Sequence, residues 1–112
     1  MPRPRMKLKN KYKAKASYED GYRFPSQLEL GRYRQLKLLL KARGQDKIYD
    51  FAVHPKYPIF INGVFICMVE LDFQYRDFRE TLHVEDTKGV DTALSKLKRK
   101  LVEAVHSLKV EL

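Results

Sequence analysis

Two acidic residues and a lysine in the second half of the chain have the types and spacing needed for phosphodiester hydrolysis. Asp72 lies near the end of one apolar run, and Asp86 and Lys88 lie at the end of the next. Side chains alternate along a strand, so Asp86 and Lys88 project from one face, roughly 7 Å apart. An adjacent strand runs about 4.8 Å away, so a pairing that puts Asp72 beside either residue gathers two carboxylates and an ammonium.

Two carboxylates in this arrangement suit a Mg²⁺ or Mn²⁺ ion. Mg²⁺ takes oxygen ligands and keeps several waters, and such a water can attack a phosphate. A lysine beside the ion can orient or deprotonate that water, or offset the negative charge of the phosphorane. We therefore expect Asp72 and Asp86 to be metal ligands and Lys88 to take part in catalysis.

The register of the strands decides which carboxylates meet. The strand expected over residues 64–75 begins apolar on both faces and becomes polar on one face where Asp72 lies. In an antiparallel pair without a bulge, Asp72 shares a face with Asp86 and Lys88 if the paired residue numbers sum to an even value. A bulge would bring Glu85 alongside Asp72 instead, so Glu85 is a substitute metal ligand.

A helix expected before the strands carries a third acidic candidate. Ser26 followed by Glu29 has the form of a capping box, and the helix is expected to run through Arg43 and end at Gly44. Glu29 lies four residues before Tyr33 on the apolar stripe of this helix, so its side chain should point inward. The other possibility is that Glu29 only caps the helix.

The remaining elements follow from turn signals and periodicity. Strand signals over residues 48–61 are broken at His54-Pro55, and Asn62-Gly63 favours a type I′ hairpin turn into the next strand. A second helix is expected from about Thr92 to Ser107, with Asp91 or Thr92 as its N-cap, followed by a short strand. The residues expected on its inward face are Leu94, Leu97, Leu101, Ala104, Val105 and Leu108.

Basic residues are concentrated at the N-terminus. The net charge is +9, and the first 17 residues contain seven basic residues and no acidic one. Few of them are apolar, so we expect a disordered arm over residues 1–17 and one folded domain over residues 18–112. Such an arm can track phosphates by releasing counterions, and a solubilising tail is the other interpretation. The basic residues are Arg3, Arg5, Lys7, Lys9, Lys11, Lys13 and Lys15.

The second helix carries another group of cations, away from its expected inward face. No acidic residue interrupts them before Glu103, which favours phosphate contact over ion pairs within the helix. We expect them close to the metal site, because the helix follows the strand that ends in Lys88. The residues are Lys96, Lys98, Arg99 and Lys100.

Several classes of site and location are excluded by composition. The single cysteine, Cys67, allows no intrachain disulfide, which indicates a reducing compartment. No apolar run approaches the roughly 20 residues of a membrane span, so no membrane partner is expected. The three histidines match no zinc motif, and there is no glycine-rich phosphate loop.

The combination of elements and motifs resembles known proteins. A helix with a glutamate, three strands bearing Asp and then Asp-x-Lys, and a closing helix resemble the core of the PD-(D/E)xK nuclease superfamily. Four blocks also resemble a family of small phage and prophage proteins of unknown function, over about residues 18–112. They are Phe24-Pro-Ser-Gln-Leu-Glu-Leu-Gly-Arg-Tyr33, Val53-His-Pro-Lys-Tyr-Pro58, Val84-Glu-Asp-Thr-Lys-Gly89 and Leu97-Lys-Arg-Lys-Leu101.

The resemblance implies an α/β protein with a restriction-endonuclease-like αβββαβ core. Position by position, it implies that Glu29 is the helical acidic residue of the catalytic set and Asp72 the central metal ligand. It makes Asp86 the second ligand and Lys88 the catalytic lysine. The implied activity is that of a metal-dependent DNA endonuclease of phage origin, in the cytoplasm of a bacterial host.

The resemblance also bears on the substrate and the oligomeric state. Small stand-alone members of this superfamily resemble Holliday-junction resolvases, which work in recombination as homodimers because two strands are cut symmetrically. Branched DNA and a homodimer are therefore expected. The alternatives are a non-catalytic nucleic-acid-binding phage accessory protein that keeps the fold, and a structural phage component. Clustered acids argue against a binder, which has no need of them facing phosphate.

Overall fold

The computed structural model describes residues 16–87 and 91–112 of the chain. The predicted arm cations, from Arg3 to Lys15, and the predicted catalytic Lys88 lie outside the described residues. Folded structure begins at Ser17, inside the segment expected to be disordered, because β1 (Ser17–Glu19) pairs with β2 (Tyr22–Phe24) in a short hairpin. No helix in the described part of the chain has the length and apolar character needed to cross a membrane.

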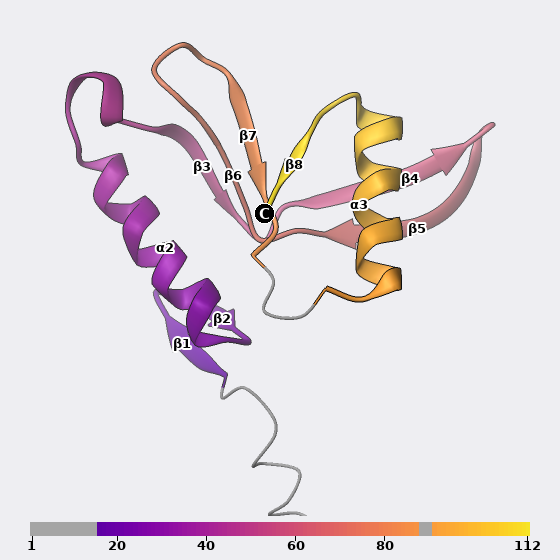
Figure 1. The fold of residues 1–112 in the computed structure, drawn as a ribbon, viewed down its shortest axis with the longest axis horizontal. Coiled ribbons are helices and arrows are strands. Elements are labelled where there is room, and N and C mark those ends of the chain that lie inside the picture. The colour runs from indigo at the N-terminus through magenta and orange to yellow at the C-terminus, as the bar shows by residue number, and fades with distance from the viewer. Residues whose placement is uncertain (1–15, 88–90) are drawn as a thin grey trace, which may run out of the picture.

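A four-stranded mixed sheet forms the centre of the molecule (Figure 1), with the strand order β3-β6-β7-β8. The strands β3 (Tyr49–Val53), β6 (Phe73–Arg76) and β7 (Leu82–Glu85) are antiparallel neighbours. The last strand, β8 (Val110–Glu111), runs parallel to β7. The parallel pairing is possible because a helix provides the crossover between the two strands.

Two helices lie on opposite faces of this sheet, as Figure 1 shows, so the predicted α/β class is confirmed. The helix α2 (Gln27–Leu40) packs over β3 and β6 in a core that includes Phe24, Tyr33 and Phe73. The helix α3 (Ala93–His106) packs against the other face in a second core. That core contains Ile59, Val69, Leu71, Val84, Val102 and Val110.

Both helices begin where the sequence predicts. Ser26 accepts a hydrogen bond from the backbone N–H of Glu29, and Thr92 caps α3 in the same way. The end of α2 was predicted wrongly, because the helix stops at Leu40 rather than Arg43. The N–H of Ile48 donates to the carbonyl of Leu39, so the chain turns back through η1 (Gly44–Asp46) to bury Ile48.

The strands expected over residues 48–61 and 64–75 form one long hairpin that bends in the middle. Beyond the bend, β4 (Lys56–Ile61) and β5 (Val64–Glu70) make a separate two-stranded sheet. Two backbone hydrogen bonds bridge the bend, from His54 N–H to the Asp72 carbonyl and from Leu71 N–H to the Pro55 carbonyl. The register therefore continues from the central sheet into β4 and β5.

The tip of this hairpin has the predicted turn. Asn62 and Gly63 both have positive φ, of 51° and 79°, as a type I′ turn requires. A similar signal at Asp20-Gly21, also with positive φ at both residues, joins β1 to β2, and the sequence analysis missed it. In Figure 1 the β4–β5 hairpin projects from the central sheet and its tip extends past α3.

The inward face of α3 differs from the predicted one. Val102 is fully buried, and Leu101 and Leu108 pack beside it, but the side chains of Leu94 and Leu97 are more than half exposed. Ala104 and Val105 are exposed as well. Polar contacts dock the helix in their place: Arg99 pairs with Asp86 and Asp91, and His106 Nε2 lies 2.8 Å from the Pro58 carbonyl.

His83, on β7, connects β8 to the turn that follows β6. His83 Nδ1 lies 2.7 Å from Glu111 Oε2, and its Nε2 lies 2.8 Å from Asp77 Oδ2. Its ring also stacks on Tyr75, with centroids 5.1 Å apart. Burial alone would lower the pKa of His83, but the hydrogen bonds to the two carboxylates outweigh it, so the pKa is raised above its ordinary value.

This arrangement predicts a pH-dependent contribution to stability. A histidine whose pKa is raised by folding stabilises fully below its unfolded pKa, and the contribution is lost as pH rises through the folded pKa. The free energy of unfolding should therefore differ most between wild type and His83→Gln at about pH 5.5, and much less at about pH 8.5. Urea denaturation at both pH values measures the difference. A gap that stayed constant or widened with pH would contradict this role.

Candidate functional site

The β6–β7 ladder ends one residue short of Asp72 and Asp86. Its last pair is Phe73 with Glu85, and an even register continued by one step would place Asp72 opposite Asp86. The N–H of Asp72 instead donates to the Glu85 carbonyl at 3.0 Å, so Asp72 and Phe73 both stand opposite Glu85, which is the pattern of a β-bulge. The parity rule therefore does not fix the face of the sheet on which Asp72 lies.

Asp72 lies at the bend of the long hairpin and is held on several sides. Its carbonyl accepts the N–H of His54, and its Oδ2 accepts the N–H of Thr87 at 2.5 Å. The second contact ties the carboxylate to the segment that follows β7, two residues after Glu85. That segment leads into Lys88, which lies outside the described residues.

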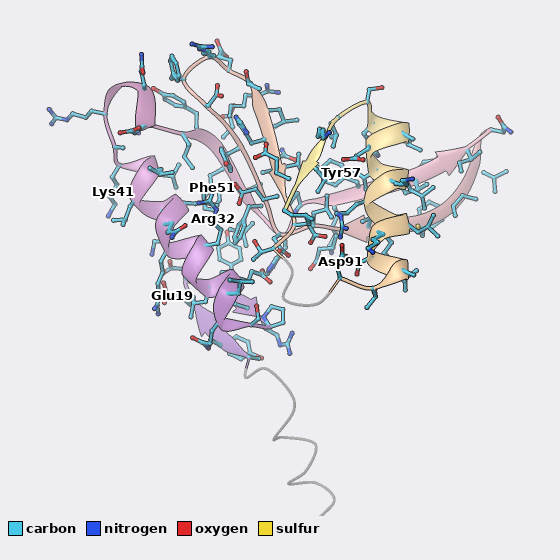
Figure 2. All side chains as sticks on the ribbon, viewed as in Figure 1. Glu19, Arg32, Lys41, Phe51, Tyr57 and Asp91 are labelled. Atoms are coloured by element: carbon cyan, nitrogen blue, oxygen red, sulfur yellow. The ribbon has the colours of Figure 1, made fainter. Side chains whose placement is uncertain are left out.

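Asp86 is almost completely buried, with 3% of its surface exposed. Its N–H donates to the Glu111 carbonyl of β8 at 2.8 Å, and Arg99 Nη1 lies 3.4 Å from its Oδ2. Arg99 is held more closely by Asp91, at 2.9 and 2.6 Å. These hydrogen bonds, with that to Asp91 first, raise the pKa of Arg99. Figure 2 shows Asp91 beside the first turn of α3.

This pairing corrects the role predicted for Arg99. Only 11% of the Arg99 side chain is exposed, so its guanidinium faces the sheet and is not presented to solvent for phosphate contact. Lys96, Lys98 and Lys100 are exposed, as predicted. Helical periodicity puts Lys96 and Lys100 one turn apart on the same flank of α3 and Lys98 on the other side.

Glu85 belongs to the opposite face and is engaged there. Arg32 of α2 binds it through two hydrogen bonds, of 2.7 and 2.6 Å, and the Tyr75 hydroxyl donates to it at 2.5 Å. Figure 2 shows Arg32 on α2, between the helix and the sheet. Burial alone would raise the pKa of Glu85, but the bonds from Arg32 and Tyr75 outweigh it and lower the pKa.

The substitute role predicted for Glu85 depended on a bulge between β6 and β7. The step at Asp72 and Phe73 is such an irregularity, but the Glu85 carboxylate is turned toward α2, where Arg32 and Tyr75 bind it. Glu85 is therefore already engaged as an ion-pair partner. The sequence analysis missed Arg32 and Tyr75 because the contact between Arg32 and Glu85 joins residues 53 positions apart.

Glu29 points inward, as predicted, and is 4% exposed. Its Oε2 lies 2.6 Å from His54 Nε2, and the backbone N–H of His54 donates to the Asp72 carbonyl. Glu29 thus reaches the bend from the α2 side through His54. His54 has a positive φ of 56° and precedes a proline at the break between β3 and β4. That break is the signal in the sequence that could have identified His54, which the sequence analysis considered only as a zinc ligand.

The donor chemistry of Asp72 and Asp86 fits a magnesium ion. In the parts of the chain that the structure describes, no group of three or more His, Cys, Asp or Glu side chains is arranged to hold a metal. Mg²⁺, however, is commonly bound by one or two carboxylates together with substrate phosphates and waters. Two carboxylates from the ends of neighbouring strands fit that lower requirement in number and in type.

A pocket of about 610 Å³ lies on the other side of β7, between α2 and the strand ends. Gly31, Arg32, Glu85 and Thr87 line it, but neither Asp72 nor Asp86 does. Its glutamate is already neutralised by Arg32. The pocket therefore adjoins the two candidate ligands without including them.

The buried ion pair between Arg32 and Glu85 predicts a large effect on stability. Arg32→Ala should lower the free energy of unfolding by about 2–4 kcal/mol, because it leaves a buried carboxylate without its cation. The matched control is Arg34→Ala, which removes an exposed pair with Glu19 and should cost less than about 1 kcal/mol. Adding Glu85→Gln to Arg32→Ala should recover part of the loss. Urea denaturation of the four proteins checks this, and equal losses for the two arginine variants would refute it.

Comparison with known proteins identifies a family. No curated protein and no solved structure matches the chain. The model of a family described as "Protein of unknown function (DUF1064)" matches residues 9–111. The match extends from within the basic N-terminal segment to β8 and includes the helix, the bent hairpin and the strand end that bears Asp86. The chain therefore belongs to this family of proteins of unknown function.

Proposed function

We propose that this protein is a Mg²⁺-dependent DNA endonuclease of phage origin, with Asp72 and Asp86 as its metal ligands. The observation that carries the proposal is the hydrogen bond from the Thr87 N–H to Asp72 Oδ2. It ties the Asp72 carboxylate to the backbone between Asp86 and Lys88, the two residues with which it would act. Two acids followed by a lysine at one strand end are what metal-assisted hydrolysis of a phosphodiester requires.

The order of the elements supports the same proposal. The central sheet and the two helices that cover it follow the chain order α2, β3, β6, β7, α3, β8 when the hairpins β1–β2 and β4–β5 are left aside. That order is compatible with the αβββαβ core that the PD-(D/E)xK resemblance implies. The fold alone does not carry an activity, so the proposal depends on the side chains at the strand ends.

Each residue of the proposed site has a separate task. A bound ion would act as a Lewis acid on the scissile phosphate and lower the pKa of its water. Asp72, held by the N–H of Thr87, and Asp86, oriented by Arg99, would supply oxygen ligands. Lys88 would orient or deprotonate the attacking water, or offset charge on the phosphorane. Glu29 would assist from the α2 side through His54.

The proposed substrate is DNA, with branched DNA as the leading form and a homodimer as the acting species. The cations available for phosphate contact on the folded domain include Lys96, Lys98 and Lys100, which are exposed on α3. The seven basic residues of the N-terminal segment add a sequence-independent contribution. Symmetric cutting of two strands gives the reason for two copies.

A second candidate function is a non-catalytic DNA-binding protein that keeps this fold. The observation that favours it is that acids near the strand ends are engaged by the protein itself, Asp86 by Arg99 and Glu29 by His54. Structural ion pairs of this kind need no metal. The two candidates differ in one outcome, since only an endonuclease cuts DNA when Mg²⁺ is added.

The deciding experiment is a cleavage assay on duplex, single-stranded and four-way DNA, with and without Mg²⁺. Wild type should cut only with the metal, and Asp72→Asn should abolish cleavage while DNA binding stays equal or improves. Asparagine can still accept the N–H of Thr87, so the fold should be kept. The matched control is Asp46→Asn, which makes the same charge change at an exposed residue of η1 and should cut normally. Cleavage by Asp72→Asn at the wild-type rate would show that another residue carries the chemistry.

The N-terminal segment should contribute affinity and not catalysis. Deleting residues 1–15, which spares Ser17 in β1, should weaken DNA binding broadly and flatten its salt dependence. Each phosphate contact contributes a slope near −0.9 in log affinity against log salt, so the loss should amount to several units. Cleavage at saturating protein should survive.

Substituting Lys96, Lys98 and Lys100 by alanine should instead reduce cleavage at saturating protein, because these cations belong to the folded domain beside the proposed site. Fluorescence anisotropy over a range of salt concentrations measures the affinity of each variant. An unchanged affinity and slope after truncation would show that the arm does not bind DNA.

A further inference from the structure

Two backbone irregularities meet at His54, the residue between β3 and Pro55 at the bend of the long hairpin. Its φ of 56° lies in the left-handed region, which is uncommon outside glycine, and a following proline favours an extended backbone instead. Across the hairpin, His54 faces Asp72, where the ladder of β6 and β7 is interrupted. A residue keeps such a conformation only where its surroundings enforce it, and residues of this kind cluster at functional sites.

The surroundings of His54 come from α2 and β2. Its Nε2 lies 2.6 Å from Oε2 of Glu29, a residue that is almost completely buried. Its ring also contacts the rings of Tyr22 and Phe24, with centroids 6.3 and 5.7 Å away. Only 21% of the His54 side chain is exposed. These contacts fix the imidazole ring, and the fixed ring restrains the backbone that carries it.

The backbone of His54 in turn holds Asp72. The N–H of His54 donates to the Asp72 carbonyl at 2.8 Å, and the N–H of Asp72 donates to the Glu85 carbonyl at 3.0 Å. Asp72 is therefore bound through its backbone on both sides, and its Oδ2 accepts the N–H of Thr87 at 2.5 Å. A β-bulge can turn a side chain in a new direction. Here the strand that faces the bulge holds it through the N–H of His54.

We infer that His54 is a positioning residue that directs the Asp72 carboxylate toward Thr87. The contacts form a chain from Glu29 to the His54 ring, and from the His54 backbone to Asp72. Glu29 has the task of holding the ring. This role rests on the proposed function, because it concerns Asp72 as a metal ligand. The hydrogen bonds themselves form without metal or DNA, so they can be tested in the protein alone.

Two substitutions separate a positioning role of the side chain from a structural role of the bend. His54→Gly accepts a positive φ freely and keeps the N–H to Asp72, but it loses the contact with Glu29. His54→Gln keeps a long side chain with an amide donor for Glu29, but a positive φ suits it less well than glycine. If His54 only has to form the bend, glycine is the better replacement. If its side chain positions Asp72, glutamine is better.

The test is hydrogen exchange of the metal-free full chain, followed by NMR. The reporter is the Thr87 amide, and the reference is the Ile48 amide, which donates to the Leu39 carbonyl away from the bend. The ratio of Thr87 to Ile48 protection should fall at least about tenfold in His54→Gly and less than about threefold in His54→Gln. The Ile48 reference removes any loss of protection that the whole fold shares.

Two further variants guard this comparison. Adding Glu29→Gln to His54→Gly removes the buried charge that the glycine variant leaves beside the bend, and Thr87 should stay deprotected in the double variant. The matched control is Asn62→Gly, which replaces another residue of positive φ, 51°, at the tip of the same hairpin. It should leave the protection ratio unchanged.

Cleavage of DNA gives a second measurement. At saturating Mg²⁺, His54→Gly should lower kcat at least about tenfold and change the KM for DNA less than about twofold, and His54→Gln should recover most of the loss. If wild type cuts no DNA, the proposed function fails and the exchange ratio alone decides the role of His54. Equal protection of Thr87 in His54→Gly and wild type would overturn that role. So would glycine performing as well as glutamine in either measurement.

Discussion

The bend in the long hairpin is the constraint on which the rest of the structure depends. Two backbone hydrogen bonds, at His54 and Leu71, keep the register constant across the bend. The proximal half can therefore pair with β7 in the central sheet while the distal half leaves the sheet and packs under α3. Asp72 lies where the distal half leaves the sheet, and its carboxylate accepts the N–H of Thr87 just beyond β7. A slip of one residue would exchange the faces of every side chain beyond the turn.

The pairing of buried carboxylates with basic side chains is a second constraint on the fold. Among the described residues three acidic side chains are buried, and each has a partner of opposite or ionisable character: Glu85 with Arg32, Asp86 with Arg99 and Glu29 with His54. A buried carboxylate without such a partner would be strongly destabilising. The partners come from both helices, so the two faces of the sheet are tied to the strand ends by ion pairs as well as by apolar packing. These pairs give the helices a defined position relative to the candidate ligands.

Local signals in the sequence predicted the parts of the fold that depend on few residues. The caps at Ser26 and Thr92, the turn at Asn62-Gly63 and the inward direction of Glu29 follow from backbone preference and periodicity, and the structure confirms them. The parity rule applied only to a regular ladder, and the hydrogen bond from the Asp72 N–H to the Glu85 carbonyl breaks the ladder at that residue. The irregularity depends on the packing of the whole hairpin, so no local pattern predicts it.

The sequence could not predict which residues of the two helices would contact the sheet. Periodicity identified the leucine stripe of α3, but it could not say that Val102 and Arg99 would face the sheet instead. The ion pair between Arg32 on α2 and Glu85 on β7 joins residues that are 53 positions apart, and no local pattern predicts it. Lys88 and the N-terminal cations lie outside the described residues, so their predicted roles remain predictions.

The pairing of β8 with β7 has a consequence for the order of folding. The N–H of Asp86 is satisfied by the carbonyl of Glu111, a residue that is synthesised only after the whole of α3. Until then the end of β7 lacks its neighbour, and α3 cannot complete the core that Val110 shares with Val84. The bent hairpin can form early, from contacts near in sequence, whereas the two candidate ligands acquire their final surroundings last. A nascent chain would therefore have its folded frame before the proposed metal site is complete, and the proposed activity toward nucleic acid would begin only after the last strand has been synthesised.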